Sequence, residues 1–173
     1  MRSVTYVAVD GGSSDNLEAT GSKLCWDAAV AKRRMENVLT KSYSNTDVQG
    51  VLAPYDGLSR GIIAALKGSG YGRGGKKLPV ITGQDAEIES VKSILAGEQY
   101  SSVFKDTSKL AETTVKMIQQ IAEKKTVETN DTKSYDNGVK VVPTMLLQPA
   151  SIDKTNIEQV LLDAKYYTKA QMQ

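Results

Sequence analysis

Two acidic side chains stand where predicted strands end. Asp85 follows an apolar run at 79–82 and one glycine, in the segment that leads to the next helix. Asp56 follows a second apolar run, at 48–53. Open parallel sheets bind their ligands outside the carboxyl ends of their strands, and two carboxylates there could hydrolyse a glycosidic bond. Because Asp56 precedes Gly57 at a turn, we favour a helix-capping role for Asp56 over chemistry, and we expect a ligand at Asp85.

A glycine-rich loop comes close to two phosphate-binding motifs. Gly70, Gly72 and Gly75 satisfy the pattern G-x-G-x-x-G, and the stretch that ends at Lys76 nearly spells a P-loop. Both motifs need a strand before the glycines and a helix after them, so that backbone amides point at phosphate. Here a predicted helix precedes the loop, a predicted strand follows it, and Lys77 replaces the Ser or Thr that would hold magnesium. We expect a solvated connecting loop and no nucleotide.

The composition removes several classes of site. The chain has no histidine, which excludes Ser-His-Asp and Cys-His nucleophiles and every zinc site that uses histidine. Its single cysteine, Cys25, cannot form an intrachain disulfide, and its apolar context predicts a buried thiol. The 22 basic and 20 acidic residues give a net charge of +2 without a basic patch, so we expect no nucleic-acid partner. We predict no catalytic residue, no metal site and no cofactor.

Alternating strand and helix patterns organise the chain. β-rich runs end in polar turns, and segments with apolar residues three and four positions apart lie between them. The predicted strands are at 4–9, 48–53, 78–82, 101–104 and 139–143, and the predicted helices at 27–40, 58–66, 86–96, 107–124 and 155–165. This order predicts an α/β fold, a three-layer parallel sheet with helices on both faces and right-handed crossovers.

Four segments carry a resemblance to a known family. They are Trp26-Asp27 before a helix, the run VLAPYDGLS at 51–59, TGQDAE at 82–87 and VFKD at 103–106. Together they resemble the monosaccharide-binding proteins of bacterial ABC transporters, of the xylose-binding and multiple-sugar-binding type, which have the type I periplasmic binding protein fold. The run at 137–143 is also similar, and the match covers about 26–173. The resemblance implies a solute-binding component, or a truncated lobe of one, that binds a monosaccharide non-covalently and is not an enzyme.

By this resemblance the chain is mainly the second, C-terminal lobe. In the family, two α/β lobes close on a sugar like a hinge. Residues 1–106 would form part of the sugar-binding second lobe, and 107–137 a helix and loop that resemble the crossover into a missing first lobe. Residues 138–173 would form a return strand and a C-terminal helix.

The resemblance also implies sugar-binding roles at five positions. Asp85 would accept hydrogen bonds from two sugar hydroxyls, since a carboxylate offers two charged oxygens. Lys105 would donate to a hydroxyl or to the ring oxygen, and Trp26 would stack on the apolar face of the sugar. Tyr55 stands where many family members carry asparagine, and Asn16 aligns with an aspartate-asparagine-asparagine segment of the family.

A missing first lobe has consequences for partners and location. The implied partners are a pentose or hexose and the membrane permease of an ABC transporter, in the periplasm. The N-terminal residues show no signal peptide, so we expect this chain, expressed alone, to stay in the cytoplasm. The helix 107–124 would lose the family partner of its apolar stripe, and we expect a homodimer through this helix. The stripe comprises Leu110, Val115, Ile118 and Ile121.

Two other functions stay open. A sugar-sensing regulatory domain would have the same architecture, but it needs an N-terminal helix-turn-helix where residues 1–12 are typical of a strand. A small α/β hydrolase would have to work with aspartate and lysine in the absence of histidine.

Overall fold

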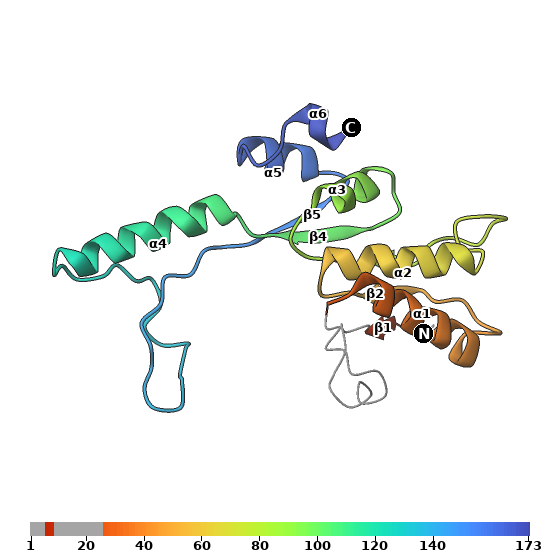
Figure 1. Ribbon diagram of the computed structural model, residues 1–173, viewed down its shortest axis with the longest axis horizontal. Helices are drawn as coiled ribbons and strands as arrows, with labels where there is room; N and C mark the ends of the chain where they lie inside the picture. The colour runs from red at the N-terminus through yellow and green to blue at the C-terminus, as the bar shows by residue number, and fades with distance from the viewer. Residues whose placement is uncertain (1–5, 9–25) are drawn as a thin grey trace. The chain divides into compact units, whose positions relative to one another are not determined.

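The computed structural model describes residues 6–8 and 26–173 of the 173-residue chain. Its elements in chain order are β1 (Tyr6–Ala8), α1 (Ala28–Ser42), β2 (Gly50–Leu52), α2 (Asp56–Gly68), β3 (Val80–Ile81), α3 (Ile88–Leu95), β4 (Ser101–Phe104), α4 (Thr107–Ala122), β5 (Ala150–Asp153), α5 (Ile157–Asp163) and α6 (Lys169–Met172) (Figure 1). They form two compact units. The first unit comprises residues 1–104 and 150–173, and the second comprises residues 105–149.

The first unit is built on a sheet whose leading strands are parallel. β1 pairs with β2 and β2 with β3, both in parallel. β4 lies beside β3, because the N–H of Tyr100 donates to the carbonyl of Ile81 and the N–H of Val103 to that of Gly83. The bridge between Gln84 and Val103 is also parallel. The carboxyl ends of these four strands therefore meet at one edge of the sheet, called here the carboxyl edge.

The last strand departs from the parallel pairing that the sequence predicts. β5 pairs with β4 in antiparallel register, with Ser101 opposite Asp153 and Phe104 opposite Ala150. The return strand was expected at 139–143, and this prediction was wrong. Asn137 forms a turn there, since its side chain accepts the N–H groups of Val139 and Lys140, both at 3.0 Å. The run at 139–143 thus belongs to the second unit, and β5 is the return strand.

α1 and α2 cover one face of the sheet and pack closely against each other. Asp27 begins α1 by accepting the N–H groups of Ala29 and Val30, at 2.7 and 3.0 Å. A Cβ atom on Gly61 of α2 would lie only 2.2 Å from the carbonyl oxygen of Ala28, so glycine sets the approach of the two helices. Their core with the sheet includes Met35, Leu39, Val51, Leu58, Ile62, Leu66 and Ile81.

The opposite face of β2 and β3 is exposed. Side chains alternate between the two faces of a strand. Val51 and Ile81 are buried against the helices, whereas Leu52 and Val80, which alternate with them, are 57% and 50% exposed. The described residues therefore bury one face of this part of the sheet and leave apolar side chains on the other.

A second core lies under α3, α5 and α6. It includes Val91, Ile94, Phe104, Ile152, Leu161 and Met172. α6 lies beyond the last predicted helix, 155–165. It forms because Thr168 and Gln171 make a capping box, and it buries Met172, which is 3% exposed. The C-terminal residues therefore contribute to the first unit.

The second unit consists of α4 and the loop that follows it. The carboxylate of Asp106 caps α4 by accepting the N–H groups of Ser108 and Lys109, at 3.1 and 3.2 Å. None of the residues of α4 is buried. The helix therefore contributes no core of its own to the second unit.

Candidate functional site

The loops after β2 and β3 are tied to each other at the carboxyl edge. The N–H of Asp56, which begins α2, donates to the carbonyl of Gln84 at 3.0 Å. In return, the N–H of Glu87 donates to the carboxylate of Asp56 at 2.9 Å. Asp85 lies between the two residues that Asp56 holds, so its backbone is fixed from both sides.

The backbone of Asp85 is held in an unfavourable conformation. Asp85 and Ala86 have φ angles of 94° and 54°, in the left-handed region that residues with a Cβ atom seldom adopt. The N–H of Asp85 donates to the carbonyl of Val103 at 2.9 Å, and the N–H of Ala86 donates to the hydroxyl of Ser102 at 3.1 Å. Such strain costs about 1–3 kcal/mol per residue and persists only where the surroundings over-determine it, which is typical of ligand sites.

A buried hydrogen-bond network supports this loop. The carboxylate of Asp56 is fully buried and accepts the side-chain amide of Gln99 and the hydroxyl of Ser102, both at 2.9 Å. Burial raises the pKa of the Asp56 carboxyl above its ordinary value, while these hydrogen bonds lower it in part. Gly83 leaves room for the network, because a Cβ atom there would lie 2.1 Å from the carboxylate of Asp56.

The predicted capping role of Asp56 was wrong. Asp56 is the first residue of α2, and its carboxylate binds Gln99, Ser102 and the N–H of Glu87. Because the side chain is fully buried, it does not form a solvent-facing carboxylate pair with Asp85. Its contacts make Asp56 the group that positions the loop of Asp85.

Two aromatic rings meet beside these loops. Trp26 immediately precedes the cap of α1, has a φ angle of 66° and is 57% exposed. Its ring centroid lies 6.2 Å from that of Tyr55 in an edge-to-face contact with an interplanar angle of 71°. The hydroxyl of Tyr55 donates to the carboxylate of Glu87 at 2.5 Å, and this bond raises the pKa of the hydroxyl. An exposed indole held by a second ring offers a flat apolar surface to a ligand.

Three of the five predicted residues lie in the first unit, at its carboxyl edge. Asp85 and Tyr55 lie on the two tied loops, and Trp26 contacts Tyr55. Lys105 follows the last residue of β4, is half-buried and begins the second unit. Asn16 lies outside the described residues.

Two residues of the site were not predicted from the sequence. Glu87 joins both loops, through its N–H to Asp56 and its carboxylate to Tyr55. Arg60 of α2 forms an ion pair with Glu87 at 2.6 Å. The only signal in the sequence was the place of Glu87, two residues after Asp85. Its partners lie 27 to 32 positions earlier in the chain, and no local pattern links them.

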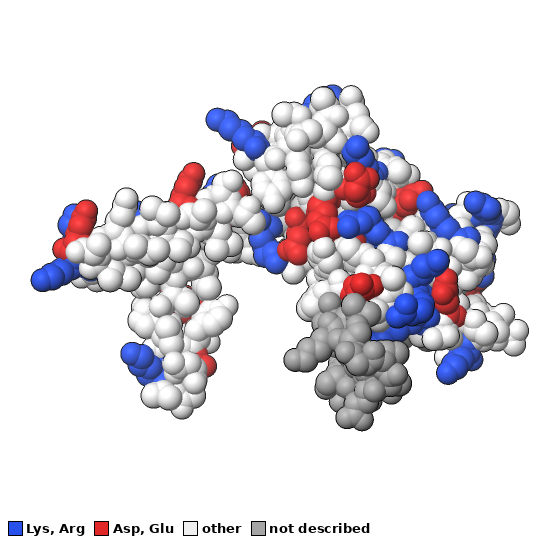
Figure 2. Space-filling model, in the orientation of Figure 1, with Lys and Arg blue, Asp and Glu red and all other residues white. Residues whose placement is uncertain are grey.

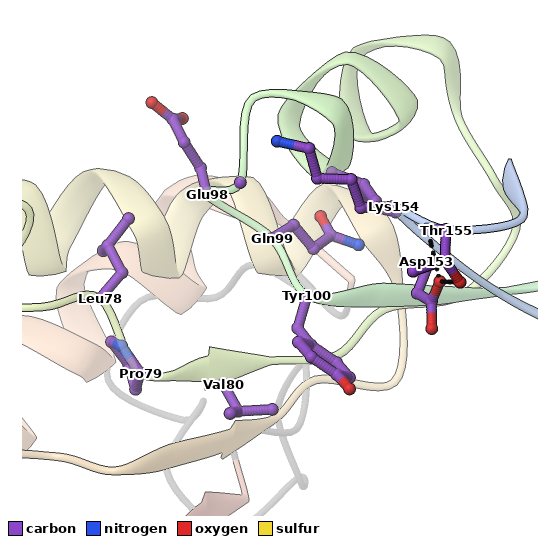
Figure 3. Close-up of a pocket in the computed structure, with 11 residues that line it drawn as sticks. Leu78, Pro79, Val80, Glu98, Gln99, Tyr100, Asp153, Lys154 and Thr155 are labelled. Carbon is purple, nitrogen blue, oxygen red and sulfur yellow. Dashed lines mark hydrogen bonds between the residues drawn. The ribbon is translucent and has the colours of Figure 1, made fainter. Parts of the chain in front are cut away.

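A separate pocket opens at the other edge of the same sheet. It has a volume of about 330 Å³ and lies where β3 and β4 begin and β5 ends, between Pro79, Tyr100 and Lys154 (Figure 3). Two of its polar side chains already form hydrogen bonds, although Oε1 of Gln99 has no hydrogen-bond partner among the described residues. Gln99 donates to Asp56, and the carboxylate of Asp153 accepts the N–H and the hydroxyl of Thr155 at 2.7 and 2.6 Å. The pocket contains none of the predicted site residues.

Two further searches of the described part of the chain were negative. Within residues 6–8 and 26–173, no group of three or more His, Cys, Asp or Glu side chains could hold a metal ion. No helix in the same ranges combines the length and apolar character needed to cross a membrane.

Comparison with known proteins decides the family. A family model described as "Periplasmic binding protein domain" matches residues 6–126. The chain belongs to this family. A solute-binding protein of an ABC transporter from Clostridium phytofermentans, solved with bound β-D-glucose, has a TM-score of 0.76 and 38% identity to this chain. The match covers 86% of this chain and 45% of that protein. The type I periplasmic binding protein fold expected from the resemblance is confirmed.

Curated members of the periplasmic binding protein family also match most of this chain with less than half of their own length. The multiple sugar-binding periplasmic receptor ChvE of Rhizobium radiobacter is 58% identical over 149 residues, which are 86% of this chain and 42% of the receptor. The D-xylose-binding periplasmic protein of Haemophilus influenzae is 35% identical over 83% of this chain and 41% of its own length. This periplasmic binding protein domain therefore spans about two fifths of the length of the curated relatives that it matches.

Proposed function

We propose that this chain is the solute-binding component, or one lobe of it, of a carbohydrate ABC transporter. It binds a monosaccharide non-covalently at the carboxyl edge of its sheet. The observation that carries the proposal is Asp85, whose strained segment is held by hydrogen bonds with Asp56 of the loop after β2 and with Val103 of β4. The 58% identity to a multiple sugar-binding receptor supports a sugar as the ligand.

Each predicted residue has a role that suits its chemistry. Asp85 accepts hydrogen bonds from two sugar hydroxyls, which are the stronger, charge-assisted kind. Trp26 stacks its exposed face on the C–H face of the sugar. Lys105 and Asn16 supply further polar contacts. Tyr55, predicted as a binding residue, has its hydroxyl proton committed to Glu87.

The chain supplies one part of the contacts of a complete receptor. Since it spans about two fifths of the length of its relatives, the groups that close over the sugar lie outside the matched region. Residues 107–137 are the crossover into that other lobe. Loss of enclosing contacts removes binding free energy, so the affinity of this chain alone is weak. A complete receptor of this kind works in the periplasm and delivers its sugar to a membrane permease.

The apolar stripe of α4 pairs with the same stripe of a second copy. Leu110, Val115, Ile118 and Ile121 are 49% to 64% exposed, which is unusual for four large apolar side chains on one helix. Figure 2 shows a largely uncharged surface along the visible face of α4. Because a two-fold dimer uses the same patch on both copies, one self-complementary stripe is enough to form the interface.

Thermal unfolding tests whether the first unit binds sugar. The purified chain is heated alone and with D-xylose, D-glucose, D-galactose or L-arabinose at high millimolar concentration. A ligand that binds only the folded state raises the melting temperature. We expect a sugar-selective increase of a few degrees. Cooperative unfolding that none of the sugars shifts would contradict the proposal, and turnover of aryl glycosides would favour a hydrolase instead.

A further inference from the structure

The hydroxyl of Tyr55 faces Glu87. It donates to one carboxylate oxygen of Glu87 at 2.5 Å, and the second oxygen of Glu87 pairs with Arg60 at 2.6 Å. Arg60 is itself held, because it donates to the hydroxyl of Ser90 at 3.0 Å, and Ser90 is fully buried. The tyrosine ring is therefore anchored through Glu87 and Arg60 to the buried part of the first unit.

Glycine at position 57 lets the ring of Tyr55 lie over the start of α2. A Cβ atom on Gly57 would lie 2.5 Å from Cε1 of Tyr55 and 2.9 Å from Cζ. Real Cβ atoms do not approach ring carbons so closely, so any larger residue at 57 displaces the ring. The helix start and the hydroxyl bond thus hold the same ring from two sides.

Trp26 is the exposed partner of this ring. Its ring contacts the Tyr55 ring edge-to-face, an arrangement that stabilises aromatic pairs beyond the burial of their surface. More than half of its surface faces solvent, and its backbone has a positive φ angle.

We propose that Tyr55 and Glu87 are positioning residues that hold Trp26 as a preformed stacking wall for the sugar. Glu87, two residues after Asp85, also donates its N–H to Asp56, so one residue links the stacking wall to the loop that carries the hydrogen-bonding group. This inference rests on the proposed function, since it explains how Trp26 and the loop of Asp85 are held in fixed positions within the same site. A preformed wall lowers the entropy cost of ordering an exposed side chain on binding.

The test uses Trp26 as its own probe, because it is the only tryptophan in the chain. Acrylamide quenching and fluorescence anisotropy are measured without sugar for the wild type, Tyr55→Phe and Gly57→Ala. Tyr55→Phe removes only the bond to Glu87, whereas Gly57→Ala displaces the ring by steric contact. We expect a higher quenching constant and a lower anisotropy in both variants. Sugar affinity should fall about threefold to tenfold, as expected for one lost hydrogen bond.

Tyr100→Phe is the matched control, since Tyr100 is 57% exposed and immediately precedes β4 at the opposite edge. It should leave the fluorescence of Trp26 and the affinity unchanged. Unchanged quenching and anisotropy in both Tyr55→Phe and Gly57→Ala would overturn the positioning role. Because these signals are read without sugar, failure of the wild type to bind any sugar would refute the proposed function separately.

Discussion

The two units differ in how their helices are stabilised. In α2 of the first unit, nine of 13 residues are buried, including a carboxylate with three hydrogen-bond donors. In α4 of the second unit, none of the 16 residues is buried. Burial of apolar surface is the main favourable term in folding, so the first unit can order itself and hold a strained loop. The helix of the second unit has no such core of its own.

This contrast agrees with the place that we propose for the binding residues. A loop can keep an unfavourable backbone only if packing and hydrogen bonds around it offset the strain. Asp85 meets that condition, because Asp56 holds the residues on both sides of it from a fully buried position. The second unit presents apolar side chains without such support and is suited to contact another protein surface.

The largest effect should come from the contact that joins the two helices of the first unit. Gly61→Ala places a methyl group 2.2 Å from a backbone carbonyl that cannot easily move. We expect a loss of about 3 kcal/mol in the free energy of unfolding, measured by urea denaturation. Gly68→Ala, at the end of the same helix, has nothing within 4 Å and should be neutral or stabilising. Equal stability of the two variants would contradict the packing described for α1 and α2.

An intermediate effect should appear in the second unit. Ile118→Lys puts a charge into the apolar stripe of α4, where 59% of the Ile118 side chain is exposed. We expect the self-association constant to fall at least about tenfold, with less than about 0.5 kcal/mol change in the stability of the first unit. Sedimentation at a series of concentrations measures the self-association constant, and urea denaturation measures the stability of the first unit.

Gln119→Lys is the control for this helix, because Gln119 is exposed and lies beside the stripe. It adds the same charge one position away and should leave self-association unchanged. A wild-type chain that stays monomeric at high concentration would contradict the dimer.

The smallest effect concerns the pH dependence of stability. Burial raises the folded-state pKa of Asp56 above its ordinary value of 3.8. Between these two pKa values the folded state binds more protons than the unfolded state, so the free energy of unfolding falls as pH rises through this window. Asp56→Asn should remove that fall. Urea denaturation of both proteins between pH 4 and 8 measures the difference, and identical pH profiles would show that Asp56 is not the group responsible.

Local patterns predicted the elements that local chemistry determines. β4 was predicted with its observed bounds, and α1 begins at the cap, Asp27, that the sequence indicates. The position of Asp85 after the end of β3 was also predicted, and α/β sheets bind their ligands at such strand ends. The role of Asp56 could not be predicted, because its partners Gln99 and Ser102 lie 43 and 46 positions away. β5 was misplaced for the same reason, since its pairing with β4 crosses the whole second unit.

Calorimetric titration of Asp85→Asn tests the central claim most directly. Asparagine tolerates a positive φ angle, so the substitution removes the charge while keeping the strained backbone. Asp163→Asn, at the exposed end of α5, makes the same chemical change away from the site. With a sugar selected by thermal unfolding, we expect Asp85→Asn to weaken binding at least about tenfold, since hydrogen bonds to charged groups contribute about 1.5–3 kcal/mol. Asp163→Asn should bind like the wild type. Wild-type affinity in Asp85→Asn would contradict the assignment of the sugar to the carboxyl edge.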